Sequence, residues 1–372
     1  MPRVLVVCEF SVLNGGERSL LAVLPTLQHG GWQIDFLAPP TGPLAEALRT
    51  LGIAIVGVRD DLAQVLATRR YDLVHANSLM MALFAGPIAA AAGVPSIGHL
   101  RDIMRLSGPK VAHLNVHTRV LAVSNAVREH HVAQGLDAAK TYVQYNGIDL
   151  STFRPSPIAG EGQGVTGGKA RDLRAELGLA PDAKLVGVVG QIILRKGQDT
   201  ALTALGPLLQ SDPLLHVVIV GERHSDKPET VEYERRLHAI AAESRAASQV
   251  HYLGTRSDMA TLLLQLSLLL HMARQEPLGR VLLEAAACGV PVVATDVGGT
   301  REIFPHGRVD GAILVPKDDA VAARSRENAI GRIDGGPHHG HRGTTANRGG
   351  VHRRTSGGRA VATLQRNGLR PA

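Results

Sequence analysis

The sequence contains few of the residues that hold together a small secreted or metal-binding domain. Among its 372 residues are only two cysteines, Cys8 and Cys288, which lie far apart in the chain. This excludes a disulfide scaffold and a four-cysteine zinc site, and a reduced, cytosolic protein is the simplest interpretation. Aromatic residues make up only 3% of the chain, which disfavours a platform for stacking single-stranded nucleic acid.

Long hydrophobic runs are absent as well. The first apolar run, residues 4–8, is too short for the core of a signal peptide and is followed by Glu9. The most apolar later stretch, residues 259–273, falls short of the roughly 20 residues that span a bilayer. We therefore expect a cytoplasmic protein whose contact with a membrane is at most peripheral.

The positive charge is confined to one end of the chain. The formal net charge is +7, yet residues 320–372 hold ten arginines against two acidic residues, so the rest is close to neutral. A nucleic-acid partner is therefore not expected. The same segment is rich in glycine and histidine and has little apolar periodicity, which predicts a disordered tail. Its histidines lie apart from cysteine and carboxylate ligands, so no metal site is expected there.

The first half of the chain alternates short β-rich runs with helical patterns, which is typical of a parallel sheet covered on both faces. Pro25 lies inside the first predicted helix, residues 17–28, where it would cost about 3 kcal/mol unless the helix kinks or starts late. Further helices are predicted at residues 42–51 and 125–134. The predicted strands are residues 3–8, 33–37, 53–58, 72–75, 94–99, 119–123 and 141–144.

A second alternating set follows, and Gly190, Gly221 and Gly254 each close one of its strands. The predicted strands are residues 184–189, 215–220, 249–253, 266–271, 291–295 and 312–315. Two such sets predict an α/β protein with two Rossmann-like domains that face each other across a cleft. We place the domains at residues 1–155 and 169–319, with a Gly- and Pro-rich linker at 156–168 and the tail at 320–372.

The strongest local signal is a pair of glutamates, Glu276 and Glu284, around a predicted helix start. Pro277 suits the first turn of a helix, and Gly279 leaves that turn open to a ligand. Exposed backbone N–H groups and the helix dipole favour a phosphate there. By spacing alone, acidic residues at an ordinary helix start remain an equal alternative.

Taken with other segments, this stretch resembles the large family of retaining glycosyltransferases of GT-B architecture, the glycosyl transferases group 1, which carries the E-x7-E motif. The resemblance covers roughly residues 1–319. The segments that carry it, in order, are residues 14–20, 145–155, 190–197, 218–222, 276–284 and 296–302.

The resemblance implies roles in binding the nucleotide-sugar donor. Glu276 would contact the sugar near its reacting end, and Glu284 would contact the nucleotide ribose. The backbone at Gly279 and Arg280 would hold the diphosphate.

It also implies roles for residues in other segments. Arg195 and Lys196 would neutralise the diphosphate as it leaves, where negative charge develops. Gly16 would let its loop approach the donor phosphate or the acceptor, and His99 would lie near the sugar. A solvated turn remains the alternative for Arg195 and Lys196, and a packed strand-end histidine remains the alternative for His99.

The family implied by the resemblance transfers a sugar from a UDP- or GDP-linked donor with retention of configuration, to a sugar or lipid-linked acceptor. It uses no metal or other cofactor, and the sequence has no Asp-x-Asp pair. We favour attack by the acceptor hydroxyl on the face from which the diphosphate leaves, because no second carboxylate nucleophile is evident.

Two departures from the family pattern affect the prediction. Gln191 stands where the family often has arginine, and the helical pattern stops after Asp319, as a change of reading frame would produce. We therefore expect reduced stability and activity. Three alternatives stay open: an inactive relative that binds nucleotide-sugar, a nucleotide-sugar epimerase, and a nucleic-acid binder that acts through the tail.

Overall fold

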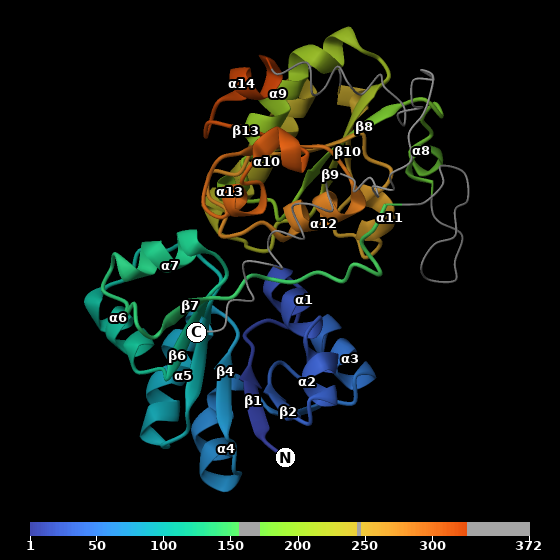
Figure 1. Cartoon of the computed structure of the whole chain (residues 1–372). Helices are drawn as coiled ribbons and strands as arrows, with labels where there is room; N and C mark the ends of the chain where they lie inside the picture. Colours follow the sequence, from blue (N-terminus) through green and yellow to red (C-terminus); the bar gives the residue numbers. More distant parts are fainter. Residues whose placement is uncertain (156–171, 244–246, 326–372) are drawn as a thin grey trace, which may run out of the picture. The chain divides into compact units, whose positions relative to one another are not determined.

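The structure is a computed structural model that describes residues 1–155, 172–243 and 247–325 (Figure 1). The chain divides into two compact units, Met1–Asp149 and a second that begins at Leu150. The first domain predicted from the sequence, residues 1–155, extends a little past the end of this first unit. The predicted linker at 156–168 and the tail from 326 onward are outside the described residues.

The first unit is built on a parallel sheet of seven described strands in the order β3-β2-β1-β4-β5-β6-β7. Most strands are nearly continuous apolar runs, such as the buried Val4–Val7 part of β1, as expected for a sheet covered on both faces. The strands are β1 (Arg3–Val7), β2 (Gln33–Leu37), β3 (Ala54–Gly57), β4 (Leu73–Ala76), β5 (Ser96–Leu100), β6 (Arg119–Ala122) and β7 (Thr141–Val143).

The helices of the first unit follow local signals in the sequence. Ser78 and Ser124 cap α5 and α7, each accepting a hydrogen bond from a backbone N–H of the first turn at 3.1 Å. The described helices are α1 (Gly15–Leu21), α2 (Leu24–His29), α3 (Pro43–Thr50), η1 (Arg59–Asp61), α4 (Leu62–Thr68), α5 (Leu79–Ala91), α6 (Gly108–Asn115) and α7 (Asn125–Val132).

The single helix predicted over residues 17–28 is wrong. The chain forms α1 and α2 instead, with a break at Ala22 and Val23. Pro25 lies in the first turn of α2, where its missing N–H breaks no intrahelical hydrogen bond. The cost of an internal proline is therefore avoided by starting a new helix.

The second unit repeats the topology with six described parallel strands in the order β10-β9-β8-β11-β12-β13. The strands are β8 (Lys184–Val189), β9 (Leu215–Val220), β10 (Val250–Tyr252), β11 (Leu268–His271), β12 (Val292–Thr295) and β13 (Ala312–Val315). The helices are α8 (Leu173–Glu176), η2 (Leu194–Lys196), α9 (Gln198–Ser211), α10 (Pro228–Glu243), η3 (Ala247–Gln249), α11 (Met259–Leu263), α12 (Arg280–Cys288), α13 (Thr300–Ile303), η4 (Gly307–Asp310) and α14 (Ala320–Ser325).

Helix α14 corrects the prediction that the folded pattern stops at Asp319. It packs against α9 (Figure 1), and Ala323 is only 1% exposed within the apolar core of the second unit. Asp319 begins this helix by accepting a hydrogen bond from the backbone N–H of Ala322. The folded part of the chain therefore extends at least six residues into the segment predicted to be tail.

Each sheet has one point at which the strand order reverses, between β1 and β4 and between β8 and β11. In open parallel sheets, ligands bind outside the carboxyl ends of the strands at such a point. The loops that leave these strand ends are therefore the places to look for a site in each unit.

Candidate active site

Glu276 lies in the loop between β11 and α12, beside the reversal point of the second sheet. Its side chain is only 5% exposed, and Oε2 accepts two hydrogen bonds. One comes from Lys196 Nζ at 2.5 Å, and the other from His271 Nε2 at 2.7 Å. This carboxylate is thus buried with a cation and an imidazole as partners.

The two partners determine the charge state of Glu276. Burial favours the neutral acid, but the charge of Lys196 and the hydrogen bond from His271 outweigh it and hold the pKa of the carboxyl well below its usual range. Burial also lowers the pKa of His271 below its ordinary value, so that ring donates as a neutral imidazole. Glu276 is therefore a fixed negative charge that can accept further hydrogen bonds.

A glycine brings Lys196 to Glu276. Gly197 follows the turn η2 with φ of +63°, in the left-handed region. A Cβ at this position would lie 1.8 Å from the carbonyl oxygen of Met272, directly after β11. The turn can approach the end of β11 only because residue 197 has no side chain.

An arginine–aspartate network secures the same turn from the other side. The guanidinium of Arg274 donates to both carboxylate oxygens of Asp199, at 2.8 and 3.0 Å, and to the Leu194 carbonyl. The backbone N–H of Arg274 donates to the Arg195 carbonyl at 2.8 Å. Within the described residues the Arg195 guanidinium itself has no ion-pair partner. Arg195 is thus held through its backbone and leaves its charge available.

Gly279 immediately precedes helix α12, with φ of +96° and no side chain to cap the first turn. A Cβ there would meet Leu282 Cδ1 at 2.7 Å, so glycine is required for packing as well as for conformation. Gly299 closes over the loop from the other side, and its N–H donates to the Glu276 carbonyl at 3.0 Å. The start of α12 is thus held in one conformation.

The first turns of α12 also contain an ion pair. Arg280 Nε contacts Glu284 Oε1 at 2.7 Å, and the side chains are 15% and 10% exposed. The resemblance implied that the Arg280 backbone holds the diphosphate and that Glu284 contacts the ribose, and the structure adds a contact between their side chains. A ribose hydroxyl that reached Glu284 would share the carboxylate with Arg280.

The predicted residues of the first unit also lie at the carboxyl edge of their sheet. His99 is the fourth residue of β5 and is 6% exposed. Its Nδ1 lies 3.1 Å from Nη2 of Arg101. Gly16, in the first turn of α1, packs on the same arginine, since a Cβ there would lie 3.0 Å from Arg101 Cδ. Arg101 therefore joins the two predicted residues, although the sequence analysis assigned it no role.

Two buried histidines lie side by side at this edge. The rings of His75 and His99 are stacked, with centroids 5.6 Å apart and planes 18° apart. Burial and the charge of Arg101 lower the pKa of His75 to about 4, and the same causes lower that of His99 well below its ordinary value. Both rings are therefore neutral at pH 7.

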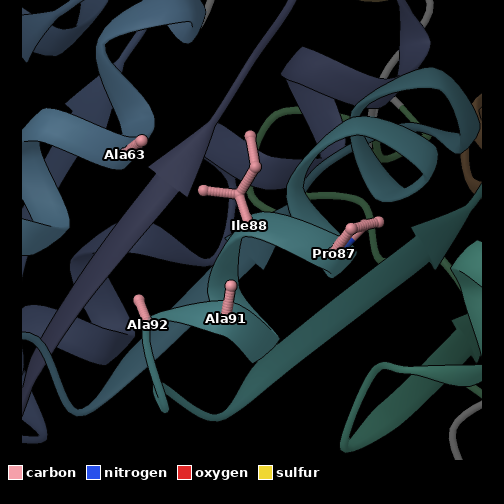
Figure 2. A pocket seen from close by; sticks show the side chains of 5 residues that line it. All are labelled: Ala63, Pro87, Ile88, Ala91 and Ala92. Carbon is pink, nitrogen blue, oxygen red and sulfur yellow. The ribbon is translucent and has the colours of Figure 1, made fainter.

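Other places are poorer candidates. A shallow hollow is lined by the apolar side chains of Ala63, Pro87, Ile88, Ala91 and Ala92 (Figure 2), and none of them can ionise. It lies by the last turns of α5, which lead to the amino end of β5 rather than to the carboxyl edge. In the described part of the chain, no cluster of three or more metal-ligating residues occurs, and no helix could cross a membrane.

Sequence reasoning missed His271, Asp199, Arg274 and Arg101. His271 ends an otherwise apolar strand, and only its place directly before the Glu276 loop could have singled it out. The partners of Arg101, Asn77 and Asn146, lie far from it in the chain, so no spacing rule relates them.

Comparisons with known proteins agree with the fold of the two units. The model of the family Glycosyl transferases group 1 matches residues 169–330, and that of Glycosyltransferase Family 4 matches residues 13–152. The first match extends past Asp319, as α14 does. Among solved structures, the HepE protein of Anabaena in complex with UDP and glucose aligns with a TM-score of 0.76 and 24% identity, over 90% of each chain.

Two curated relatives show similar identity over part of their length. The α-maltose-1-phosphate synthase of Mycobacterium tuberculosis is 32% identical over 56% of this chain and 51% of its own. The D-inositol 3-phosphate glycosyltransferase of Stackebrandtia nassauensis is 29% identical over 71% of this chain and 64% of its own. The matched region thus spans between half and two thirds of the length of these relatives. With both family models matching in order over most of the sequence, the chain belongs to the glycosyl transferases group 1 and has the two-domain GT-B fold.

Proposed function

We propose that this protein transfers a sugar from a nucleotide-sugar to an acceptor hydroxyl with retention of configuration and without a metal ion. The observation that carries the proposal is the ionised Glu276 held by Lys196 and His271 beside the uncapped start of α12. A sugar offers hydroxyl donors to the carboxylate, and a diphosphate suits the helix start and the cations.

Each charged group has a separate task in this reaction. Glu276 accepts hydrogen bonds from sugar hydroxyls and does not act as an acid, because its carboxyl stays ionised. Lys196 has three N–H donors, so it can remain bonded to Glu276 and also reach a phosphate oxygen. Arg195, which lacks an ion-pair partner within the described residues, supplies the second positive charge. Two cations and a helix start would stabilise the leaving diphosphate as a metal ion would.

The route to retention follows from what surrounds Glu276. A covalent intermediate would need a carboxylate nucleophile about 5 Å from an acid partner. Glu276 is instead engaged by two donors, and Glu284 is paired with Arg280. We therefore propose attack by the acceptor hydroxyl on the same face from which the diphosphate leaves, with a phosphate oxygen taking the proton.

The comparisons suggest the first donor to test, because HepE of Anabaena was solved with UDP and with UDP-glucose. A thermal-shift screen with UDP, GDP and ADP, then with their glucose conjugates, identifies the base. A ligand at 100 times its dissociation constant stabilises by roughly 2.7 kcal/mol, so one base should stand out. No shift with any nucleotide would contradict the proposal.

Product analysis then tests the reaction. With donor and acceptor, the anomeric configuration of the product is read by NMR, and inversion would refute the proposed route. With donor alone, an epimerised sugar would favour the epimerase. Glu276→Gln should lower kcat on the order of 100-fold or more while nucleotide binding persists, as for the loss of one charge-stabilising group. Glu243→Gln, at the exposed end of α10, is the matched control.

A further inference from the structure

Arg101 holds several polar groups at the carboxyl edge of the first sheet. Its Nε donates to the Asn77 carbonyl at 3.0 Å, and Nη1 donates to Asn146 Oδ1 at 2.7 Å. Nη2 lies 2.9 Å from Asn77 Oδ1 and 3.1 Å from His99 Nδ1. The planar guanidinium thus orients side chains from three separate segments.

These contacts determine where the proton of His99 lies. A guanidinium has only donors, so the Nδ1 atom facing it must accept a hydrogen bond. A neutral imidazole that accepts at Nδ1 carries its proton on Nε2. That Nε2 atom is buried and has no hydrogen-bond partner among the residues described.

The remaining neighbours keep the ring neutral. The cationic guanidinium of Arg101 contacts the His99 ring, and the ring of His75 is stacked on it. The nearby carboxyl of Glu17, on α1, is 5% exposed, and burial raises its pKa. Burial raises the pKa of the Cys8 thiol as well. Burial, the charge of Arg101 and the neighbouring His75 ring all disfavour an imidazolium at His99.

We propose that Arg101 is a positioning residue that fixes His99 as the Nε2–H tautomer, so that His99 donates a hydrogen bond to a substrate oxygen and does not act as a general base. A buried N–H without an acceptor is costly, and a hydroxyl or phosphate oxygen of a substrate supplies the acceptor. The identity of that oxygen rests on the proposed function, whereas the tautomer of His99 does not depend on it.

The tautomer can be measured in the ligand-free protein. Long-range ¹H–¹⁵N correlation spectra of protein labelled at its 17 histidines distinguish protonated from unprotonated ring nitrogens. His99→Gln identifies the His99 signals by their loss. We expect a protonated Nε2 and an unprotonated Nδ1 from pH 6 to pH 8. A protonated Nδ1, or titration of His99 within this range, would overturn the inference whether or not the protein transfers sugar.

Arginine variants test the cause. Arg101→Met removes the donors, so the Nδ1–H tautomer or the imidazolium should become visible, and Arg101→Lys should restore the wild-type pattern in part. The control is Arg119→Lys, because the wild-type Arg119 side chain lies over the Tyr142 ring. An unchanged His99 spectrum in Arg101→Met would show that Arg101 does not set the tautomer.

Activity separates a donor from a base. The amide of His99→Gln can place an N–H near the position of Nε2, whereas His99→Ala cannot. We expect kcat/KM to fall on the order of 100-fold in His99→Ala and no more than about tenfold in His99→Gln, the range for one hydrogen bond to a charged or reacting group. Equal losses in the two variants would refute the donor role. Titration with UDP, glucose and UDP-glucose, followed at the His99 Nε2 proton, shows whether the acceptor is a phosphate or a sugar oxygen.

Discussion

Lys196→Met tests whether the ion pair with Glu276 organises the second unit. The change keeps the side-chain stem and removes the ammonium that lies 2.5 Å from Oε2. Removing one partner of a buried ion pair typically costs about 3–5 kcal/mol, because the other charge is left uncompensated. The hydrogen bond from His271 survives, so we expect a value near the lower limit, about 3 kcal/mol.

The double variant Lys196→Met/Glu276→Gln should be less destabilised than Lys196→Met. Without a carboxylate there is no buried charge to leave unpaired, and the amide can still accept from His271. We expect a coupling free energy of about 2 kcal/mol, within the range for contacting residues. A coupling below about 0.5 kcal/mol would refute the view that the pair is tightly linked.

The destabilisation caused by Lys196→Met should also depend on pH, with a sign that the pKa of Glu276 determines. In the wild type the pKa of Glu276 lies below its ordinary value of 4.5, so its stabilising contribution is present above that pH and lost as pH falls further. In Lys196→Met we expect burial to dominate and to raise that pKa above its unfolded value. The contribution is then lost as pH rises, so the gap between variant and wild type should shrink from pH 7.5 to pH 5.

Urea unfolding measures these free energies. The single tryptophan, Trp32, lies in the first unit, so its fluorescence reports that unit while circular dichroism reports both. The loss of stability in the Lys196 variants should appear in the circular dichroism transition and not in the Trp32 fluorescence transition. Lys184→Met, whose pair with Asp212 is 25% and 34% exposed, is the control and should cost no more than about 1 kcal/mol. A destabilisation of Lys196→Met that does not vary with pH would contradict the assignment.

Three further variants or conditions test other parts of the structure. Gly197→Ala should destabilise the protein by more than the roughly 1–2 kcal/mol of left-handed backbone strain, and it should weaken nucleotide binding. The control Gly178→Ala, at a position with φ of +64° and open space around it, should show the strain alone. Equal urea midpoints for the two variants would contradict this prediction. Glu284→Gln should weaken nucleotide affinity in calorimetry more than Arg280→Met does, and a purely structural ion pair would leave both affinities unchanged. Because the pKa of His75 falls to about 4 on folding, the wild type should lose roughly 2–3 kcal/mol between pH 7 and pH 4.5, and His75→Gln should lose less over that range.

The fold could be predicted almost completely from the sequence, because most of its strands are nearly continuous apolar runs. Every strand in the described part was predicted, and six-residue β9 matches its prediction at both ends. The errors have local causes. Pro25 starts a helix rather than interrupting one, and α14 is too short to show a period. Packing of Ala323 into the core, which no local pattern reveals, stabilises that helix.

The candidate site could be predicted only in part. The spacing of Glu276 and Glu284 pointed to a helix start, and the structure has one there. The contacts that set the chemistry join residues far apart in sequence, such as Lys196 with Glu276 and Arg101 with Asn146. Such pairs follow from the strand order of each sheet, so they become visible only once the fold is known.

The two units use one physical device at corresponding places. In each, the loop or helix after the first strand carries a glycine that lies against a group directly after another strand: Gly16 lies on Arg101, after β5, and Gly197 lies on the carbonyl of Met272, after β11. In each, a cation then orients groups that would otherwise have several conformations or protonation states, His99 in the first unit and Glu276 in the second. Burying these groups is costly without a ligand, so each unit gives up stability for preorganisation. Substrate binding should return part of that stability, because a substrate oxygen would accept a hydrogen bond from His99 Nε2, which has no partner among the described residues.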